Sequence, residues 1–235
     1  NEIENYIKKN NLQKKYNQSL NKNGINSAKN TFYSAKEVEI FFNNNIDSFS
    51  YINYYNFLSK SISKGRPFLE YLKEKADDWM KKDENINKKD AIAYLLKVFV
   101  IDPVNGKKEE LFLKESLKKR FPQFTIIEPT PNQDYKECWD LKLKNKEIEF
   151  CIQHKPKSFF YAINTTAKNS FNKIKKASID YNNDIFLTKI SDLGQIEFYI
   201  RDKNKKNQCN FVSLNNFKVE NLKQNQIKKL AKKTF

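Results

Sequence analysis

The stretch from Cys138 to Pro156 constrains the fold of this chain more than any other segment. Apolar and polar residues alternate in two short runs, separated by a polar turn around Asn145, a residue that tolerates a left-handed backbone. Because successive side chains of a strand point to opposite faces of a sheet, this pattern predicts two adjacent strands. The predicted apolar face consists of Trp139, Leu141, Leu143, Ile148, Phe150 and Ile152.

The opposite face of this strand pair gathers polar side chains. Asp140 projects from the first strand, and Gln153 and Lys155 project from the second. Hydrolysis of a phosphodiester requires oxygen donors that hold a hard divalent cation, together with a positive charge near the attacking water. The three side chains therefore indicate a metal-dependent nuclease centre. In a lysine-rich chain the same spacing also arises by chance, so the surrounding elements must agree with it.

The charge of the chain favours a polyanionic partner. Its 235 residues suffice for one well-cored domain with an added subdomain, and 44 basic residues against 28 acidic ones give a net charge of +16. Nucleic acid is the leading candidate, although only three of the basic residues are arginines and a lysine-biased composition raises the charge of unrelated proteins too. No stretch approaches the ~20 apolar residues of a spanning helix, which argues against a membrane role.

The cysteines and the single histidine exclude other classes of site. Cys138, Cys151 and Cys209 are widely spaced and odd in number, which argues against a disulfide framework and against a zinc cluster. His154 alone cannot supply the chemistry of nucleases that use several histidines, and we expect it to be partly buried on the apolar face of its strand. The chain begins without a signal-peptide pattern, and a cytoplasmic location is expected.

Residues 1–103 are predicted to form a helical subdomain that serves DNA contact or dimerisation. A capping box at Ser34 and Glu37 opens one helix, and further helices are expected at about 48–63, 68–80 and 89–100. Tyr54 and Leu58 belong to an apolar stripe at helical spacing, which favours packing over base stacking.

Residues 104–201 are predicted to form an α/β (α+β) core in which helices flank a mixed central sheet. A turn at 102–106 precedes a helix at 107–120, on which Glu110 shares a side with Leu113 and Leu117. An acid on that side either has a functional partner or stabilises the start of the helix. After it we expect a strand at 124–128, a loop to 134, the strand pair, a helix at 167–181 and strands at 184–190 and 195–200. Residues 202–235 are a basic C-terminal extension with a predicted helix at 219–233.

From Gly106 to Arg201 this order of elements resembles the PD-(D/E)xK nuclease superfamily. The resemblance implies that Asp140 is the first metal-binding acid, that Gln153 occupies the (D/E) position, that Lys155 is the catalytic lysine, and that Glu110 is the acid of the preceding helix. We expect Mg2+ to be held by Asp140, by the amide oxygen of Gln153 and by the main-chain carbonyl of His154. An amide brings no charge, which argues against a two-metal arrangement.

A narrower set of residues is similar to type II restriction endonucleases of the MjaI kind. This set consists of Gly106, Glu110, Thr130, Pro131, Asp140 and the run Lys155–Phe159. The similarity implies a homodimer that cuts a short palindrome in double-stranded DNA, CTAG in that family. Arg66, Lys157 and Ser158 are expected DNA contacts, and the alternative for each is a surface residue or a phosphate contact.

Two other functions stay open at this stage. A repair or junction-resolving nuclease would use the same core but recognise DNA structure instead of sequence. A non-catalytic nucleic-acid-binding protein would need only the charge and the aromatic residues. Digestion of plasmid DNA separates these possibilities, because discrete bands indicate sequence-specific cutting.

Overall fold

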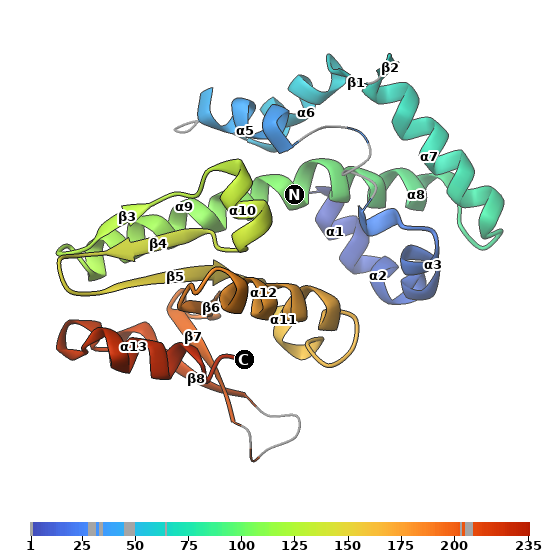
Figure 1. The fold of residues 1–235 in the computed structure, drawn as a ribbon. Helices are drawn as coiled ribbons and strands as arrows, with labels where there is room; N and C mark the ends of the chain where they lie inside the picture. The colour runs from blue at the N-terminus through green and yellow to red at the C-terminus, as the bar shows by residue number, and fades with distance from the viewer. Residues whose placement is uncertain are drawn as a thin grey trace. The chain divides into compact units, whose positions relative to one another are not determined.

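The computed structural model describes residues 2–27, 32, 35–44, 50–63, 65–202, 204 and 209–235 (Figure 1). The protein is mixed α/β and divides into two compact units, Asn1–Lys108 and Glu109–Phe235. The predicted capping box at Ser34 and Glu37 lies outside the residues whose side chains are described. Within the described part of the chain, no helix is long and apolar enough to cross a membrane.

The first unit is built mainly from helices. Its elements are α1 (Glu2–Lys9), α2 (Leu12–Lys15), α3 (Asn17–Lys22), η1 (Ile25–Ser27), α5 (Ala35–Asn44), α6 (Tyr51–Ser59), β1 (Ile62–Ser63), β2 (Arg66–Pro67), α7 (Phe68–Lys82) and α8 (Lys88–Leu96). Tyr54 and Leu58 of α6 are buried in the core of this unit, which confirms the predicted packing stripe. The helices predicted at 68–80 and 89–100 correspond to α7 and to α8 with the turn that follows it.

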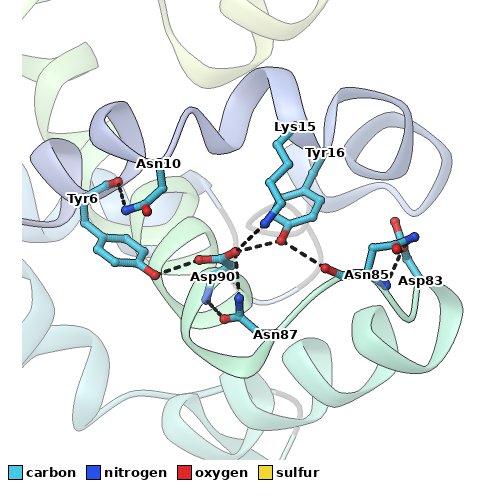
Figure 2. Close-up of polar contacts among 8 residues, drawn as sticks. All are labelled: Tyr6, Asn10, Lys15, Tyr16, Asp83, Asn85, Asn87 and Asp90. Atoms are coloured by element: carbon cyan, nitrogen blue, oxygen red, sulfur yellow. Dashed lines mark hydrogen bonds and ion pairs between the residues drawn. The ribbon is translucent and has the colours of Figure 1, made fainter.

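A buried carboxylate, Asp90, ties the helices of this unit together (Figure 2). Its oxygens accept hydrogen bonds from the hydroxyls of Tyr6 at 2.8 Å and Tyr16 at 2.7 Å and from the amide of Asn87 at 2.9 Å, and the Lys15 ammonium lies 3.4 Å away. Burial by itself would raise the pKa of Asp90, but these hydrogen bonds and the Lys15 charge outweigh it and hold the pKa below its ordinary value. The carboxylate therefore stays charged in the core because it has a full set of donors.

The turn predicted at 102–106 is wrong. The chain instead passes from α8 through a π-helical turn, η2 (Lys97–Ile101), directly into α9 (Asp102–Arg120). Pro103 is compatible with a helix because it lies in the first turn of α9, where its missing N–H costs little. In an uninterrupted α-helix its ring would clash with the carbonyl of Phe99, four residues earlier, and the wider π-helical turn is a known way to relieve such crowding.

The second unit contains a mixed six-stranded sheet. Its strands are β3 (Thr125–Ile127), β4 (Leu141–Lys144), β5 (Glu149–His154), β6 (Ile185–Ile190), β7 (Ile196–Arg201) and β8 (Cys209–Ser213), and they neighbour one another in this order. All neighbouring strands are antiparallel except β5 and β6, which are parallel and joined by α11 (Lys157–Tyr161) and α12 (Lys168–Asp180) (Figure 1). This arrangement confirms the predicted mixed sheet with flanking helices.

Both faces of the sheet are covered, which explains its many apolar residues. One face packs against α9 and against the C-terminal helix α13 (Gln224–Ala231), and its core contains Leu113, Leu117, Leu141, Leu143, Phe150, Ile152, Phe186, Phe198 and Ile227. The other face packs against α11 and α12, and its core contains Cys151, Phe160, Phe171, Ile174, Ile185, Leu187 and Tyr199. The register pairs Leu141 with Ile152 and Leu143 with Phe150, as the alternating pattern requires.

Two details of the predicted strand pair are wrong. Trp139 packs with Cys138 and Cys151 in the core on the α12 side, not with Leu141, because strand β4 begins only at Leu141 and the alternation does not extend before it. Asn145 does not adopt a left-handed backbone. Its side-chain oxygen instead accepts hydrogen bonds from the backbone N–H groups of Glu147 at 2.9 Å and Ile148 at 2.8 Å, and so closes the turn.

The loop predicted before Asp134 is also wrong, because a helix, α10 (Pro131–Glu137), begins there. Thr130 caps it by accepting a hydrogen bond from the backbone N–H of Gln133, whose side chain accepts from the N–H of Thr130 in return. Proline at the first helical position supports this start. The helix ends at Cys138, whose φ of 57° turns the chain toward β4.

The C-terminal residues belong to the second unit. Strand β8 extends the sheet beside β7, and Ile227 and Ala231 of α13 are buried. The helix predicted at 219–233 forms only in part, as α13, and a short turn, η4 (Val219–Asn221), precedes it. A similar turn, η3 (Leu214–Asn216), follows β8. Gln224 fixes α13 to the sheet by hydrogen bonds to the backbone of Glu149 and to the carboxylate of Asp184.

We expect Asp90→Ala to lower the free energy of unfolding of the first unit by about 3 kcal/mol, because it removes the buried carboxylate that accepts hydrogen bonds from Tyr6, Tyr16 and Asn87. Hydrogen exchange of the α8 amides measures this loss. Asp78→Ala is the matched control, since its exposed carboxylate contacts only Lys82 on the same helix and an exposed pair of this kind is worth about 0.5 kcal/mol. Because the pKa of Asp90 is lowered, its contribution persists above its ordinary pKa of 3.8 and disappears as the pH falls further. Equal exchange in the two variants would contradict the assignment.

Candidate active site

Asp140 and the end of β5 meet because β4 and β5 are antiparallel. Asp140 lies directly before β4, and Gln153 and His154 are the last two residues of β5. The backbone N–H of Asp140 donates to the carbonyl of Ile152 at 2.8 Å, which extends the strand pairing by one residue. The start of one strand and the end of the other therefore lie at the same edge of the sheet.

The Asp140 carboxylate is held by two short hydrogen bonds. Its Oδ1 accepts from the side-chain amide of Gln153 at 2.6 Å, and its Oδ2 accepts from the backbone N–H of His154 at 2.6 Å. Gln153 is itself buried, so its rotamer is restricted by packing. The structure thus brings the predicted acid and the predicted amide into direct contact.

The carbonyl of His154 faces the same side of β5 as its N–H, because both groups of one strand residue point toward the same neighbouring strand. Since that N–H bonds to Asp140, the carbonyl is directed toward Asp140 as well. The imidazole of His154 is 11% exposed, as expected for a partly buried histidine. Its Nδ1 lies 3.4 Å from the hydroxyl of Thr188, and its Nε2 lies 3.7 Å from the carboxylate of Glu109.

Lys155 is the first residue after β5. Because successive side chains of a strand point to opposite faces, its side chain projects to the same face of the sheet as that of Gln153. Its backbone N–H donates to the carbonyl of Thr188 at 2.9 Å and fixes it to β6. The ammonium lies 5.9 Å from the centre of the Phe159 ring on α11. The Lys155 charge acts on the Asp140 carboxylate.

Burial raises the pKa of Asp140 to about 6. The Lys155 charge and the hydrogen bond from His154 oppose this rise, while the nearby carboxylate of Asp134 reinforces it. Asp140 is therefore an acid whose charged form is poorly compensated by the protein alone. A cation bound next to it would lower the pKa again and hold it ionised.

Two acids near the site were not predicted. Asp134, on α10, raises the pKa of Asp140 through its negative charge. The sequence signal for α10 is Thr130 followed by Pro131, with Gln133 as the capping partner of Thr130. Glu109 is the α9 acid beside His154 and is half exposed. Glu110 lies on α9 and is partly buried. The position of the Glu110 side chain depends on which face of α9 packs against the sheet, and the local sequence pattern does not determine this.

The predicted DNA contacts lie in both units. Lys157 and Ser158 begin α11, two and three residues after Lys155, and both are exposed. The Lys157 ammonium forms an ion pair of 2.7 Å with Asp192. Arg66 lies on β2 in the first unit and contacts Glu74 at 2.7 Å.

The oxygen donors at this edge of the sheet suit one Mg2+. This ion is usually held by one or two carboxylates, with water filling the other positions. Asp140 supplies a carboxylate, and the Gln153 amide and the His154 carbonyl supply neutral oxygens. The described residues contain no cluster of three or more His, Cys, Asp or Glu side chains placed to hold a metal. An ion at this edge of the sheet would therefore be held largely by neutral oxygens and water.

A hollow of about 450 Å3 lies at the β4–β5 turn, at the opposite end of the strand pair from Asp140. Its lining includes Lys144, Glu149, Asp184 and Gln224, which contact one another. These polar groups already bond to one another, so they do not form a set of groups directed at a ligand.

Comparisons of the chain with protein-family models, with curated proteins and with solved structures find no match in any of the three. The functional assignment therefore depends on the geometry and chemistry of the site.

We expect Asp140→Asn to stabilise the protein at neutral pH when no metal is added. The pKa of Asp140 rises from 3.8 to about 6 on folding, so its contribution to stability decreases as the pH rises through this interval. The uncharged variant should gain about 1–2 kcal/mol at neutral pH and much less at pH 3.8. Hydrogen exchange of the β4 and β5 amides at both pH values measures the gain.

Asp192→Asn is the control for this experiment, because Asp192 is 83% exposed and has a lowered pKa. It should not stabilise the protein at neutral pH. A loss of stability in Asp140→Asn at neutral pH would show that the carboxylate is a structural group.

Proposed function

We propose that the protein is a Mg2+-dependent endonuclease of the PD-(D/E)xK type that cuts double-stranded DNA at a specific sequence. The observation that carries this proposal is the contact between Asp140 and Gln153, at 2.6 Å, beside the charge of Lys155. An acid, an amide and a lysine at one edge of a mixed sheet supply the groups that phosphodiester hydrolysis needs.

The order of the elements supports the proposal. A helix, α9, precedes the antiparallel strands β3, β4 and β5, and α11 and α12 then lead to the parallel strand β6. The superfamily that the sequence resembles has a helix, a three-stranded meander, a helix and a further strand. The residues proposed as the site lie at the same edge of this core, at the end of β5 and directly before β4.

Asp140, the amide oxygen of Gln153 and the carbonyl of His154 would hold the ion. When bound, Mg2+ would supply positive charge that stabilises the attacked phosphate and the leaving oxygen. For the amide oxygen to face the ion, Gln153 must rotate its side-chain amide, because its nitrogen now donates to Asp140. Asp140 would then lose one donor and gain a cation, which compensates its buried charge better.

Lys155 would act on the water and on the phosphate. Its ammonium can donate hydrogen bonds to both and brings a fixed positive charge beside the developing negative charge. In the reaction the water oxygen forms a new bond to phosphorus, the bond to the leaving oxygen breaks, and the water proton passes to solvent. These steps require Lys155 at the reacting phosphate, whereas DNA binding also draws on many other lysines.

We further propose a short palindromic target, with CTAG as the first sequence to test, and a homodimer that reads it symmetrically. With few arginines, base contacts would fall to lysine, asparagine and glutamine side chains. Glu109 of α9, whose carboxylate lies 3.7 Å from the His154 ring, could add charge for metal binding.

A non-catalytic nucleic-acid-binding protein is the second candidate. The observation in its favour is that Gln153 and His154 already satisfy both oxygens of Asp140 without an ion. Such a protein would use its net charge of +16 and would need no metal. Metal-dependent cutting distinguishes the two candidates.

We expect the protein to cut plasmid DNA into discrete fragments with Mg2+ and not with EDTA, and Lys155→Ala to slow cutting by about 100-fold or more. DNA binding by this variant should weaken only a few-fold, because one charge among many is lost. Gel analysis of the digest and fluorescence anisotropy in EDTA measure the two effects.

Lys118→Ala is the matched control, since it removes one exposed lysine from α9, on the other face of the sheet. It should cut at the parent rate. Cutting by Lys155→Ala at the parent rate would refute the proposed catalytic role, and activity only on branched or damaged DNA would indicate repair.

Gln153→Glu should make metal binding stronger and the metal-free protein less stable. Two carboxylates would then face each other at a contact that now measures 2.6 Å, and their repulsion is relieved only by a proton or a cation. We expect Mg2+ to raise the melting temperature of this variant more than that of the parent, whereas Gln153→Ala should respond less than the parent. The same response to Mg2+ in all three proteins would contradict a metal site at residue 153.

A further inference from the structure

The turn between β6 and β7 places a carboxylate against Lys157. Because β5 and β6 are parallel, the residues that follow them emerge at the same edge of the sheet, where Asp140 also lies. Lys157 follows β5, Asp192 follows β6, and their charged groups are 2.7 Å apart.

This turn is closed by its own hydrogen bonds. The backbone N–H of Gly194 donates to the carbonyl of Ser191 at 3.0 Å, and that of Ser191 donates to the carbonyl of Gln195 at 2.8 Å. Gly194 has a φ of 70°, a value that side-chain-bearing residues rarely adopt. These hydrogen bonds fix the backbone of the turn, and the fixed backbone positions the Asp192 carboxylate.

The ion pair is open to solvent. The side chain of Asp192 is 83% exposed and that of Lys157 is 43% exposed, so a DNA phosphate can approach the same ammonium. Tyr161, four residues after Lys157 on α11, is also exposed. The pair of Lys189 and Glu197, at 3.1 Å, is much less exposed by contrast and cannot exchange partners as readily.

We propose that Asp192 competes with DNA phosphates for Lys157 and so weakens the binding of DNA at this edge of the sheet. The inference rests on the proposed function, because it takes DNA as the partner. A carboxylate and a phosphate are alternative acceptors for one ammonium group, and only one of them can hold it closely at a time. Each DNA contact by Lys157 therefore requires that Asp192 release it.

Competition by Asp192 for Lys157 limits non-specific DNA binding by a chain with a net charge of +16. Lysines bind phosphates of any sequence, so unopposed charge near the site would increase non-specific binding. Asp192 lowers this contribution without removing the lysine. Stable binding then depends more on contacts to bases, which is the property that a sequence-specific nuclease needs.

The test measures binding of a mixed-sequence DNA duplex to the full chain in EDTA, by fluorescence anisotropy. We expect Asp192→Asn to bind about two- to five-fold more tightly than the parent, the range expected from the strength of exposed ion pairs. Lys157→Gln should bind more weakly than the parent. In the Lys157→Gln background, Asp192→Asn should have no further effect, because the residue for which it competes is gone.

Glu115→Gln is the matched control for the change in net charge. Glu115 also forms an exposed ion pair, at 2.8 Å with Lys118, but on α9 at the other face of the sheet. It should tighten binding less than Asp192→Asn does. An equal effect of the two substitutions, or an equal gain from Asp192→Asn with and without Lys157, would overturn the inference in favour of general charge.

Failure of this inference is distinguishable from failure of the proposed function. If the parent binds and cuts DNA but Asp192→Asn binds no more tightly, only the competition by Asp192 is refuted. If the parent binds DNA and Asp192→Asn tightens it, yet neither protein cuts with Mg2+, the inference holds for a binding protein. If the parent does not bind duplex DNA, both proposals are refuted.

Discussion

The hydrogen bonds that Asp140 accepts from Gln153 and from the backbone of His154 are the interaction on which the candidate site depends. They exist because β4 and β5 are antiparallel and in a register that places the start of one strand at the end of the other. The large apolar side chains on the α9 face fix that register, since a slip of one residue would turn all of them to the opposite face of the sheet. Packing on one face of the sheet therefore determines the geometry of polar groups on the other.

The electrostatics of the site follow from the same packing. Burial raises the pKa of Asp140, and Lys155 compensates only part of that effect. A carboxylate in this state weakens the fold when it is charged, which is typical of residues retained for binding or catalysis instead of stability. Asp90 in the first unit shows the opposite case, because several donors hold its pKa down and make it a structural group.

The part of the fold that depends on alternation could be predicted from the sequence. Leu141, Leu143, Phe150 and Ile152 indicate their common face, and the approach of Asp140 to Gln153 follows from their pairing. Helix α10 is harder to predict because proline is common in loops, although after Thr130 it begins a helix. Strand β8 was missed because it lies at the edge of the sheet and most of its side chains are partly or fully exposed, which leaves little apolar pattern. The positions of Glu109 and Asp134 depend on how helices pack against the sheet, and such contacts between distant segments leave no local signal.

The most direct test of the account is the binding of Mn2+, as a paramagnetic substitute for Mg2+, measured by electron paramagnetic resonance on the protein without DNA. The account predicts that the parent holds one ion and that Asp140→Asn loses it, because the Asp140 carboxylate is the charged ligand that the strand pair supplies. Equal uptake of Mn2+ by the two proteins would show that the ion binds elsewhere and would contradict the proposed metal centre.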